Sequence, residues 1–594
     1  MRAGVGDVGF PRSRLMRWLV EPDVTRGLRF LEDDGGWTYV GYPELGSLAR
    51  RTASAIAAHA GPGDGPVAIV LPNGLDFVAT FFGALLSGRP ACPLAPRLAF
   101  ADSDSYTDHV VRVLEVARPS LVVTEADALE PLKRSVRGAG LATPVVRLEP
   151  DPVADTAQGD LPQTAVVQFT SGSTGRPRGA VVSMANLEAN IEQNIRWLHL
   201  SADDAYAGWL PLFHDMGLVS LLTWMGSQMD VSVMRPDQFI RFPGRWLQCM
   251  GRDGATISVT PTFGVAYAAR RVPEDALEGC DFSRWRTLVV GSDPVSPATL
   301  TGFLDRLRPY GFKASTFTPA YGLAEATLSV SGRERNDSRR SSDEGPAVVH
   351  VDWDDLRFGE PVSVLERGTI EPGDPFRDDS GWITSCGPPH PELEVTIVDE
   401  DGDALPEAHL GEILVSGPTI VDGYMGETTA HSSGVIDGVL HTGDAGFVLD
   451  GCLYIVGRLG DALKVRGLSV FAEDLDARLG AVPDVRRGRC VTLTGSHRGR
   501  TTVVALVEEE PGPWVPLVAQ SLTRGLPAEV DIKVASVPRG TIERTTSGKP
   551  RRRGMWTAFA SGALPATVVL DGRDGAIGVP EGPARATVGT GDGD

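Results

Sequence analysis

The sequence has few features that would place the protein in a membrane, in an oxidising compartment or on a nucleic acid. Its six cysteines lie far apart, without the paired spacing of a zinc site or a redox couple, so we expect reduced thiols and a cytoplasmic location. No apolar run reaches the roughly 18 residues of a membrane span, and the arginine-bearing N-terminus lacks the apolar run of a secretory signal. The net charge of −21 disfavours nucleic acids and anionic membranes, which attract positive surfaces.

Lysine is also scarce, because only five of the 56 basic residues are lysines. The chain has no Gly-Lys-Ser/Thr sequence, which disfavours a phosphoryl-transfer NTPase with a Walker loop. One of the few lysines, Lys549, ends the sequence Thr-Thr-Ser-Gly-Lys. A compact ammonium group there fits between two anions where a planar guanidinium would not, so Lys549 is a candidate functional residue. The alternative is an ordinary solvated loop lysine.

The most informative segment, residues 170–179, reads TSGSTGRPRG. Glycines let the backbone approach oxygen anions, hydroxyls add neutral donors, and guanidinium groups offset negative charge, so this composition suits a polyphosphate. Residues 165–169 and 179–183 on either side are predicted to be strands, so the loop joins strand to strand. The alternative is a Gly/Ser hairpin loop that binds nothing.

Strand-like and helix-like segments alternate along the 594 residues, which predicts an α/β fold of several units, with a smaller α+β domain at the end. We predict strands at 66–72 and 288–290, helices at 76–86 and 186–198, and a hairpin formed by 489–494 and 501–507. The predicted domains are 1–457, a smaller domain at 458–570, and a disordered tail at 571–594.

Five further segments accompany the loop: Trp209-Leu-Pro-Leu-Phe-His-Asp-Met-Gly217, Tyr321-Gly-Leu-Ala-Glu325, His441-Thr-Gly-Asp444, Gly457-Arg458 and the Lys549 segment. Their order and spacing resemble the adenylate-forming ligases, over a match that runs from about Trp37 to Arg553. Residues 241–246, 255–258, 321–328 and 384–387 are most similar to the fatty acyl-AMP ligases in that superfamily. Residues 331–384 resemble the insertion of this subgroup, and the alternative is a variable surface loop.

The resemblance implies a large adenylation domain with a small mobile lid, and two half-reactions. A carboxylic acid attacks the α-phosphorus of ATP, with Mg²⁺ bound, to give acyl-AMP and pyrophosphate. A phosphopantetheine thiol, of an acyl carrier protein or of coenzyme A, then takes the acyl group. Alternatives left open are a CoA ligase for a bulky secondary-metabolite acid and a nucleotide-binding scaffold without catalysis. The acid is a long-chain acid or a bulky cyclic or polyketide-derived one.

The same resemblance implies roles for individual residues. Lys549, Glu325 and His214 would be catalytic; Glu325 and Thr170 would hold the metal; Gly460 would be the hinge. Apolar and small residues that would line the acyl pocket are Trp209, Phe213, Met216, Thr262 and Phe263. Residues that would bind ATP or AMP are Thr170, Ser171, Gly172, Ser173, Thr174, Gly175, Arg178, Gly291, Ser292, Asp293, Pro294, Ala320, Tyr321, Gly322, Asp444 and Arg458. A buried histidine with a purely structural role is the alternative for His214.

Three positions depart from the pattern of the family. Arg178 stands where relatives usually carry lysine in the phosphate loop, which keeps the positive charge. Met184 replaces a histidine, so a contact that anchors the loop would be missing. Gly460 replaces an aspartate or lysine at the hinge, and because glycine accepts large φ/ψ changes, rotation of the small domain stays possible.

Overall fold

The computed structural model describes residues 13–61, 63–97, 103–149, 160–170, 177–333, 343–373, 381–425, 434–465, 468–486, 488–497, 500–523, 526, 530–544 and 549–572. The chain forms two compact units. The first comprises Met1–Asp352, Arg357–Arg377 and Gly381–Gly460, and the second comprises Trp353–Leu356, Asp378–Ser380 and Asp461–Asp594. Helices and strands alternate along the first unit, so the predicted α/β class is confirmed.

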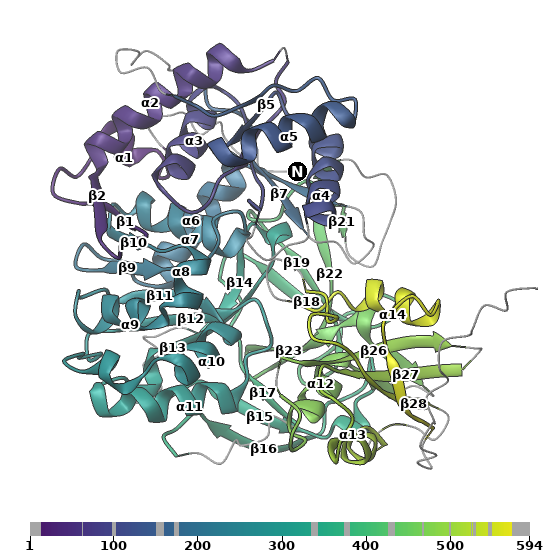
Figure 1. The fold of residues 1–594 in the computed structure, drawn as a ribbon. Helices are drawn as coiled ribbons and strands as arrows, with labels where there is room; N and C mark the ends of the chain where they lie inside the picture. Colours follow the sequence, from purple (N-terminus) through teal and green to yellow (C-terminus); the bar gives the residue numbers. More distant parts are fainter. Residues whose placement is uncertain are drawn as a thin grey trace, which may run out of the picture. The chain divides into compact units, whose positions relative to one another are not determined.

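Two large sheets form the centre of the first unit (Figure 1). The larger sheet has the order β14-β13-β12-β11-β9-β10-β1-β2: Ser329–Gly332, Phe317–Gly322, Thr287–Gly291, Ile257–Pro261, Ala205–Gly208, Asp230–Val233, Gly27–Leu31 and Trp37–Gly41. The other sheet has the order β20-β8-β7-β4-β3-β5-β6: Tyr424–Met425, Arg178–Ser183, Thr164–Thr170, Ala91–Pro93, Val67–Val70, Leu121–Thr124 and Val145–Val146. Central strands of both sheets, such as the pairs β11–β12, β3–β4 and β3–β5, are parallel and buried, as all-apolar runs such as Val-Ala-Ile-Val in β3 require.

Smaller antiparallel sheets complete the first unit. One contains β18, β19, β22, β21 and β23: Glu394–Val398, Gly411–Ser416, Val439–Leu449, Gly434–Ile436 and Cys452–Arg458. The other lies within the predicted insertion and contains β16, β15 and β17: Val364–Thr369, Ala347–Val351 and Trp382–Thr384.

Helices cover and separate these sheets. They are α1 Arg17–Val20, α2 Tyr42–His59, α3 Leu75–Leu86, α4 Ser103–Ala117, α5 Ala126–Gly138, α6 Met184–Trp197, α7 Asp215–Gly226, α8 Pro236–Arg241, α9 Pro243–Gly251, α10 Thr262–Arg271 and α11 Pro297–Leu307. Helices α2 and α3 lie side by side (Figure 1), and α6 and α7 each contact strands of the central sheets. Residues 217–226 of α7 are all buried, so this helix belongs to the core. No helix in the described ranges is long and apolar enough to cross a membrane.

Most elements expected from the sequence are confirmed. The predicted strands correspond to β3, β7, β8 and β12, the helix at 76–86 corresponds to α3, and β26 and β27 form the predicted hairpin. The helix expected to begin at Asn186 begins at Met184 instead. Ser183 is its N-cap, because the Asn186 N–H donates to Ser183 Oγ at 3.1 Å while the Ser183 N–H donates to Asn186 Oδ1 at 3.1 Å. Residues 573–594 of the predicted tail lie outside the described residues.

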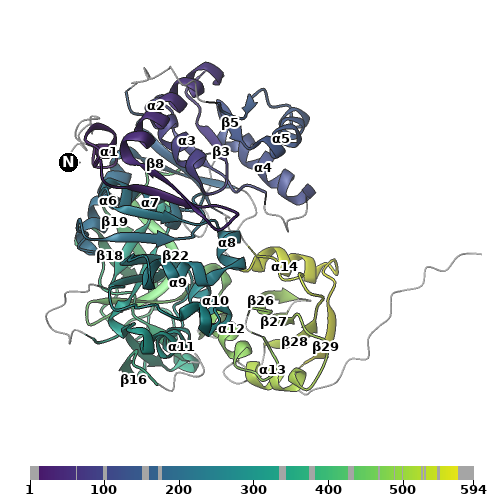
Figure 2. The ribbon, with the colours of Figure 1, turned by 60° about the vertical axis from the view of Figure 1, so that its left-hand side comes forward.

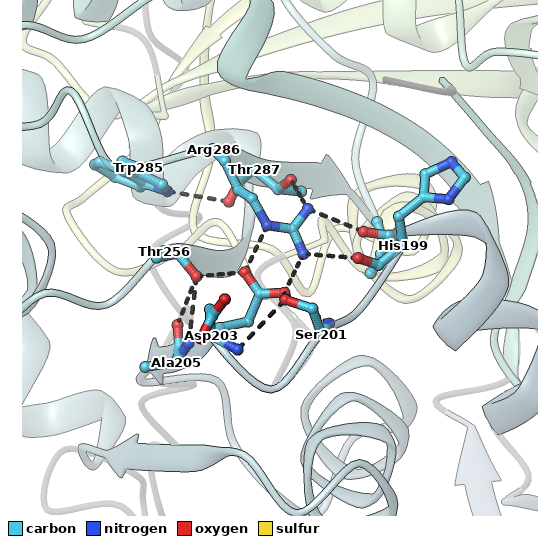
Figure 3. Close-up of polar contacts among 10 residues, drawn as sticks. His199, Ser201, Asp203, Ala205, Thr256, Trp285, Arg286 and Thr287 are labelled. Carbon is cyan, nitrogen blue, oxygen red and sulfur yellow. Dashed lines mark hydrogen bonds and ion pairs between the residues drawn. The ribbon is translucent and has the colours of Figure 1, made fainter. Parts of the chain in front are cut away.

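A buried ion pair fixes the amino-terminal ends of three parallel strands of the larger sheet (Figure 3). Arg286, next to β12, approaches Asp204, next to β9, through two contacts of 2.6 Å, and Thr256, next to β11, donates to Asp204 Oδ1 at 2.8 Å. Burial alone would raise the pKa of Asp204, but the hydrogen bonds and charge of Arg286 outweigh it and lower that pKa. Bidentate pairs of this kind fix geometry as well as charge.

The second unit is built on a four-stranded sheet with helices on both faces. The sheet has the order β26-β27-β28-β29, at Cys490–His497, Arg500–Val507, Asp531–Ser536 and Thr567–Asp571, and the ribbon β24–β25 comprises Leu463–Val465 and Leu468–Val470. Figure 2 shows α13 (Trp514–Thr523) and α14 (Arg552–Ala560) on opposite sides of this sheet. Successive side chains of β27 point to opposite faces of the sheet, so one strand contributes to the core on both sides. Val503 and Ala505 pack toward α12 (Ala472–Gly480) and α13, and Val504 and Leu506 pack toward α14.

Glu473, at the start of α12, has a largely buried carboxyl group, with 17% of its side chain exposed. Burial raises its pKa to about 7, and the nearby charge of Arg552 offsets only part of that rise. Folding raises the pKa of this carboxyl group, so its protonated form favours the folded state. The resulting contribution to the free energy of unfolding is fully present below the pKa of the unfolded chain and is lost as pH rises through about 7.

We therefore expect Glu473→Gln to stabilise the second unit at pH 8 by on the order of 2 kcal/mol, and to change it little at pH 5. Hydrogen–deuterium exchange of peptides from α12 and β26 measures this, with slower exchange in the variant at pH 8. The exposed Glu510→Gln is the matched control. Equal exchange of wild type and Glu473→Gln at both pH values would contradict the pKa assignment.

Candidate active site

The predicted phosphate loop closes the hairpin between β7 and β8. Thr170 pairs in register with Arg178, so the loop joins two antiparallel strands as expected. Ser171, Gly172, Ser173, Thr174 and Gly175 lie outside the described residues. Arg178 is 5% exposed, and its guanidinium carbon lies 3.8 Å from the ring centroid of Tyr424 on β20. A buried guanidinium stacked on an aromatic face is a fixed positive charge at the base of the loop.

Tyr424 links Arg178 to the candidate metal ligand. Its hydroxyl donates to Glu325 Oε1 at 2.9 Å, and the backbone of Glu325 accepts from the Val421 N–H at 3.0 Å. Glu325 therefore lies on the same side of the hairpin as Arg178, with its carboxylate oriented by a tyrosine. No cluster of three metal-binding side chains occurs among the described residues. A single carboxylate fits Mg²⁺ bound chiefly by phosphate oxygens and water, so the residues present are compatible with that ion.

Tyr321, Asp444 and Arg458 come together from β13, β22 and β23. The Tyr321 hydroxyl donates to Asp444 Oδ2 at 2.6 Å, and Arg458 Nε lies 2.7 Å from Asp444 Oδ1. Asp444 and Arg458 are cross-strand partners, so the register of β22 and β23 sets this pair. Burial and then the charge of Asp444 raise the pKa of Tyr321 well above its ordinary value, which keeps this hydroxyl a donor. Each Asp444 oxygen retains a lone pair for a further donor.

A turn after β12 lies against β13. Gly291 ends β12, and a Cβ atom there would lie 2.8 Å from the carbonyl oxygen of Ala320, so the close approach of the two strands requires glycine. Ser292 follows with φ of +73°. The Thr262 hydroxyl donates to the carbonyl of Pro294 at 3.1 Å, which ties the turn to α10. Gly322 ends β13, so these predicted nucleotide-binding residues lie at the carboxyl ends of parallel strands, where open α/β sheets bind ligands.

The predicted acyl-pocket residues form part of an aromatic cluster. The Trp209 ring stacks on Phe239 with centroids 3.9 Å apart, and Phe263 meets its edge at 5.6 Å. A Cβ atom at residue 264 would lie 2.6 Å from a Trp209 ring carbon, so glycine is required beside this ring. Trp209 is buried, whereas Phe263 is 39% exposed, so the cluster has an accessible side.

His214 and Phe213 precede α7, and the rings of these two residues lie 4.8 Å apart. The Gln168 amide of β7 donates to the carbonyl of Phe213 at 2.8 Å, which connects this loop to the strand that leads into the phosphate loop. Met216, in the first turn of α7, is half-buried against the core.

Lys549 and Gly460 fall in different units. Lys549 is an exposed residue of the second unit, beside an isolated β-bridge between Arg544 and Pro550. Gly460 is the last residue of the first unit, within a single 3₁₀ turn at Leu459–Asp461. The roles of both residues stay predictions.

Sequence reasoning missed three residues that hold the site together: Tyr424, Gln168 and Asn73. The Asn73 amide donates to the carbonyls of Leu210 and Met234 and accepts from the Leu212 N–H, so it fixes the loop that carries Trp209 and His214. A polar residue three positions after the buried strand β3 was the available signal for Asn73. No local pattern marks Tyr424, because its importance depends on partners far away in the sequence.

Comparison with known proteins shows the family of the chain. The model of the AMP-binding enzyme family matches residues 23–425. A long-chain-fatty-acid–AMP ligase, FadD32 of Mycobacterium marinum, is 30% identical over 94% of this chain and 96% of its own length. A solved structure from a study of fatty acyl-adenylate ligases from E. coli and L. pneumophila has a TM-score of 0.80 and 27% identity, over 93% of this chain and 98% of that one.

A further solved structure, a fatty acyl-adenylate ligase from L. pneumophila in complex with acyl adenylate and pyrophosphate, has a TM-score of 0.65 and 25% identity, over 93% of this chain and 97% of that one. The family model spans more than half of the chain, and the FadD32 match covers nearly all of it. The chain therefore belongs to the AMP-binding enzyme family, as an acid-activating ligase of the adenylate-forming type that is related to the fatty acyl-AMP ligases.

Proposed function

We propose that the protein converts a fatty acid and ATP to acyl-AMP and pyrophosphate, and then transfers the acyl group to the phosphopantetheine thiol of an acyl carrier protein. The observation that carries this proposal is the Tyr321–Asp444–Arg458 cluster, which offers an oriented carboxylate beside a half-buried ring near the carboxyl end of β13. These groups suit a nucleoside: the carboxylate accepts ribose hydroxyls, and the ring and the Gly291 turn flank adenine.

The phosphates would lie against the loop at 170–179. Backbone N–H groups and hydroxyls there donate to the departing pyrophosphate, and Arg178 offsets its charge. Mg²⁺, when bound, supplies a second positive charge on the phosphate oxygens, and Glu325 and Thr170 would hold it. In-line transfer to a carboxylate depends on this positioning and charge compensation, because the protein makes no covalent bond to the nucleotide.

The acid would enter along the aromatic cluster. Trp209, Phe213, Met216, Thr262 and Phe263 offer an apolar wall beside His214, which suits an alkyl chain with its carboxylate near the α-phosphate. Lys549 would bridge that carboxylate and the α-phosphate during adenylation. We propose that residues 458–570 act as a lid that turns about Gly460 between the two half-reactions, with residues 331–384 as the insertion of the fatty acyl-AMP ligases. The six free thiols agree with a cytoplasmic location.

An acid-panel assay tests this function directly. Adenylate is trapped with hydroxylamine and pyrophosphate release is measured, with medium- and long-chain fatty acids and bulky cyclic acids. Each acid is then offered with holo-acyl carrier protein or with coenzyme A. Acid-dependent pyrophosphate release followed by thioester on the carrier protein is the expected result. ATP binding without acid-dependent release would overturn the proposal, and thioester on coenzyme A alone would overturn the choice of acceptor.

Glu325→Gln should raise the Mg²⁺ concentration needed for half-maximal adenylation by about tenfold, because a neutral amide is a weaker ligand for a hard cation. The hydrogen bond from Tyr424 is retained in the variant, so local structure is preserved. A Mg²⁺ titration of pyrophosphate release measures the shift. The exposed strand residue Glu394 serves as control through Glu394→Gln, and an unchanged titration for Glu325→Gln would reject the metal-ligand role.

A further inference from the structure

Arg552 is a buried cation that faces three carboxylates of the second unit. It is the first residue of α14, and 11% of its side chain is exposed. Its Nη2 atom lies 2.6 Å from Asp476 Oδ2, and Nη1 lies 3.5 Å from Asp461 Oδ2 and 3.8 Å from Glu473 Oε1. Burial alone would lower the pKa of Arg552, but the three carboxylates outweigh it and raise that pKa above its ordinary value. Arg552 is therefore charged at every pH at which the protein would work.

Arg552 and the carboxyl groups of Asp461, Glu473 and Asp476 form a network, and Asp476 is its most firmly held member. The N–H and hydroxyl of Thr492, on β26, both donate to Asp476 Oδ1, at 2.5 and 2.7 Å. Asp476 therefore uses one oxygen for the sheet and the other for Arg552. An arginine between fixed carboxylates loses its rotamer freedom, so the position of its backbone is fixed as well.

One end of the network lies where the second unit begins. Asp461 directly follows Gly460, and its carbonyl accepts from the Thr494 hydroxyl at 3.1 Å. Gly460, the predicted hinge, has no side chain that could fix the direction of the chain. Asp461 is the next residue, and its side chain can do so. Its carboxylate does so through Arg552.

The other end lies beside Lys549. Only Pro550 and Arg551 separate Lys549 from Arg552. The Arg551 N–H donates to the carbonyl of Glu543 at 2.9 Å, and Pro550 forms a bridge with Arg544. Proline fixes φ at residue 550, and these two contacts hold the backbone at residues 550 and 551, so only a short restrained segment joins Lys549 to Arg552.

We propose that Arg552 is a positioning residue for adenylation: it ties Asp461, at the start of the second unit, to the segment that carries Lys549. A turn at Gly460 then moves Lys549 as part of one rigid arm. This inference rests on the proposed function, because Lys549 acts only in the step that forms the adenylate.

Arg552→Gln should lower the rate of acid-dependent pyrophosphate release at saturating ATP and acid by about 10- to 100-fold, as expected for a small misplacement of a catalytic group. Thioester formation from supplied acyl-AMP should change by less than about threefold, because Lys549 does not take part in that step. Arg552→Lys keeps the charge but reaches fewer carboxylates, so it should recover part of the rate. Arg551→Gln is the matched control. Arg551 is the residue before Arg552, and its side chain is exposed and has no polar contact among the described residues.

Removal of this cation leaves Asp461, Asp476 and the carboxyl group of Glu473 without a counter-charge, which can unfold the unit. The charge-matched Arg552→Gln/Asp476→Asn variant avoids this, because it removes one positive and one negative charge. It should show the same selective loss of adenylation with a native near-ultraviolet circular dichroism spectrum. A double-mutant cycle with Asp461→Asn then tests the tie to the hinge: the effect of Asp461→Asn should largely disappear in the Arg552→Gln background.

Three results would overturn the inference: normal adenylation by the charge-matched variant, equal loss of both half-reactions in a folded variant, or additive effects in the cycle with Asp461→Asn. Failure of the proposed function is recognised separately. In that case the wild-type protein itself releases no pyrophosphate in response to any acid, whereas failure of the positioning role leaves wild-type activity intact.

Discussion

Replacement of Lys549 by alanine should lower acid-dependent pyrophosphate release by about 10²- to 10³-fold, the usual effect of removing one donor from developing negative charge. The ammonium group would offset the charge that builds up between the acid carboxylate and the α-phosphate, and no other group in the Thr-Thr-Ser-Gly-Lys segment is cationic. Thioester formation from supplied acyl-AMP should remain near the wild-type rate. Measurement of the two half-reactions separately gives this contrast.

Lys313→Ala is the matched control for Lys549→Ala, because Lys313 is a surface lysine paired with Asp343. Lys549→Arg tests geometry at constant charge and should recover only a minor part of the rate, since a planar guanidinium cannot occupy the same position between two anions. Equal loss of both half-reactions in Lys549→Ala would contradict the assigned role.

Asp444→Asn should raise the KM for ATP by about 10- to 100-fold, because charge-assisted hydrogen bonds contribute about 1.5 to 3 kcal/mol each. The amide keeps the size of the side chain but can accept at only one atom, so it cannot serve Tyr321, Arg458 and a ribose together. Tyr321→Phe removes one hydrogen bond and keeps the ring, so its effect should be smaller. Steady-state pyrophosphate release as a function of ATP concentration ranks the variants.

The control for Asp444→Asn lies in the same hairpin. Asp450 occupies the turn between β22 and β23 with φ of +52°, a conformation that asparagine tolerates well. Asp450→Asn should leave the KM for ATP unchanged. An unchanged KM in Asp444→Asn as well would show that the nucleoside binds elsewhere.

Sequence reasoning succeeded where the signal is local. The apolar runs of β3 and β7, the helical spacing of α6 and the loop between β7 and β8 are all readable over a few neighbouring residues. The order of the eight strands in the larger sheet was not predictable, because β1 and β2 join it next to β10, far away in sequence. Even the start of α6 was displaced, since a serine and an asparagine can each act as N-cap and only the backbone decides between them.

Residues of the candidate site were likewise predictable only where the signal is local. Asp444 and Arg458 could be identified because each belongs to a longer motif, and their cross-strand pairing follows from the hairpin. Tyr424 could not, because it matters only through Arg178 and Glu325, which are distant in the sequence. Arg552 had a similar disadvantage: its partners lie in an earlier helix and at the start of the second unit, and three successive arginines at 551–553 look alike until burial distinguishes the middle one.

The ion pair between Asp204 and Arg286 has a consequence for changing the substrate. It fixes β9, β11 and β12 at their amino-terminal ends, whereas Trp209 and Thr262 directly follow β9 and β11, and Gly291 is the last residue of β12. The groups that hold the sheet and the groups that we propose to face the acid are thus at opposite ends of each strand. Libraries that vary residues 209, 262 and 263 to accept new acids can therefore leave the register of the sheet untouched.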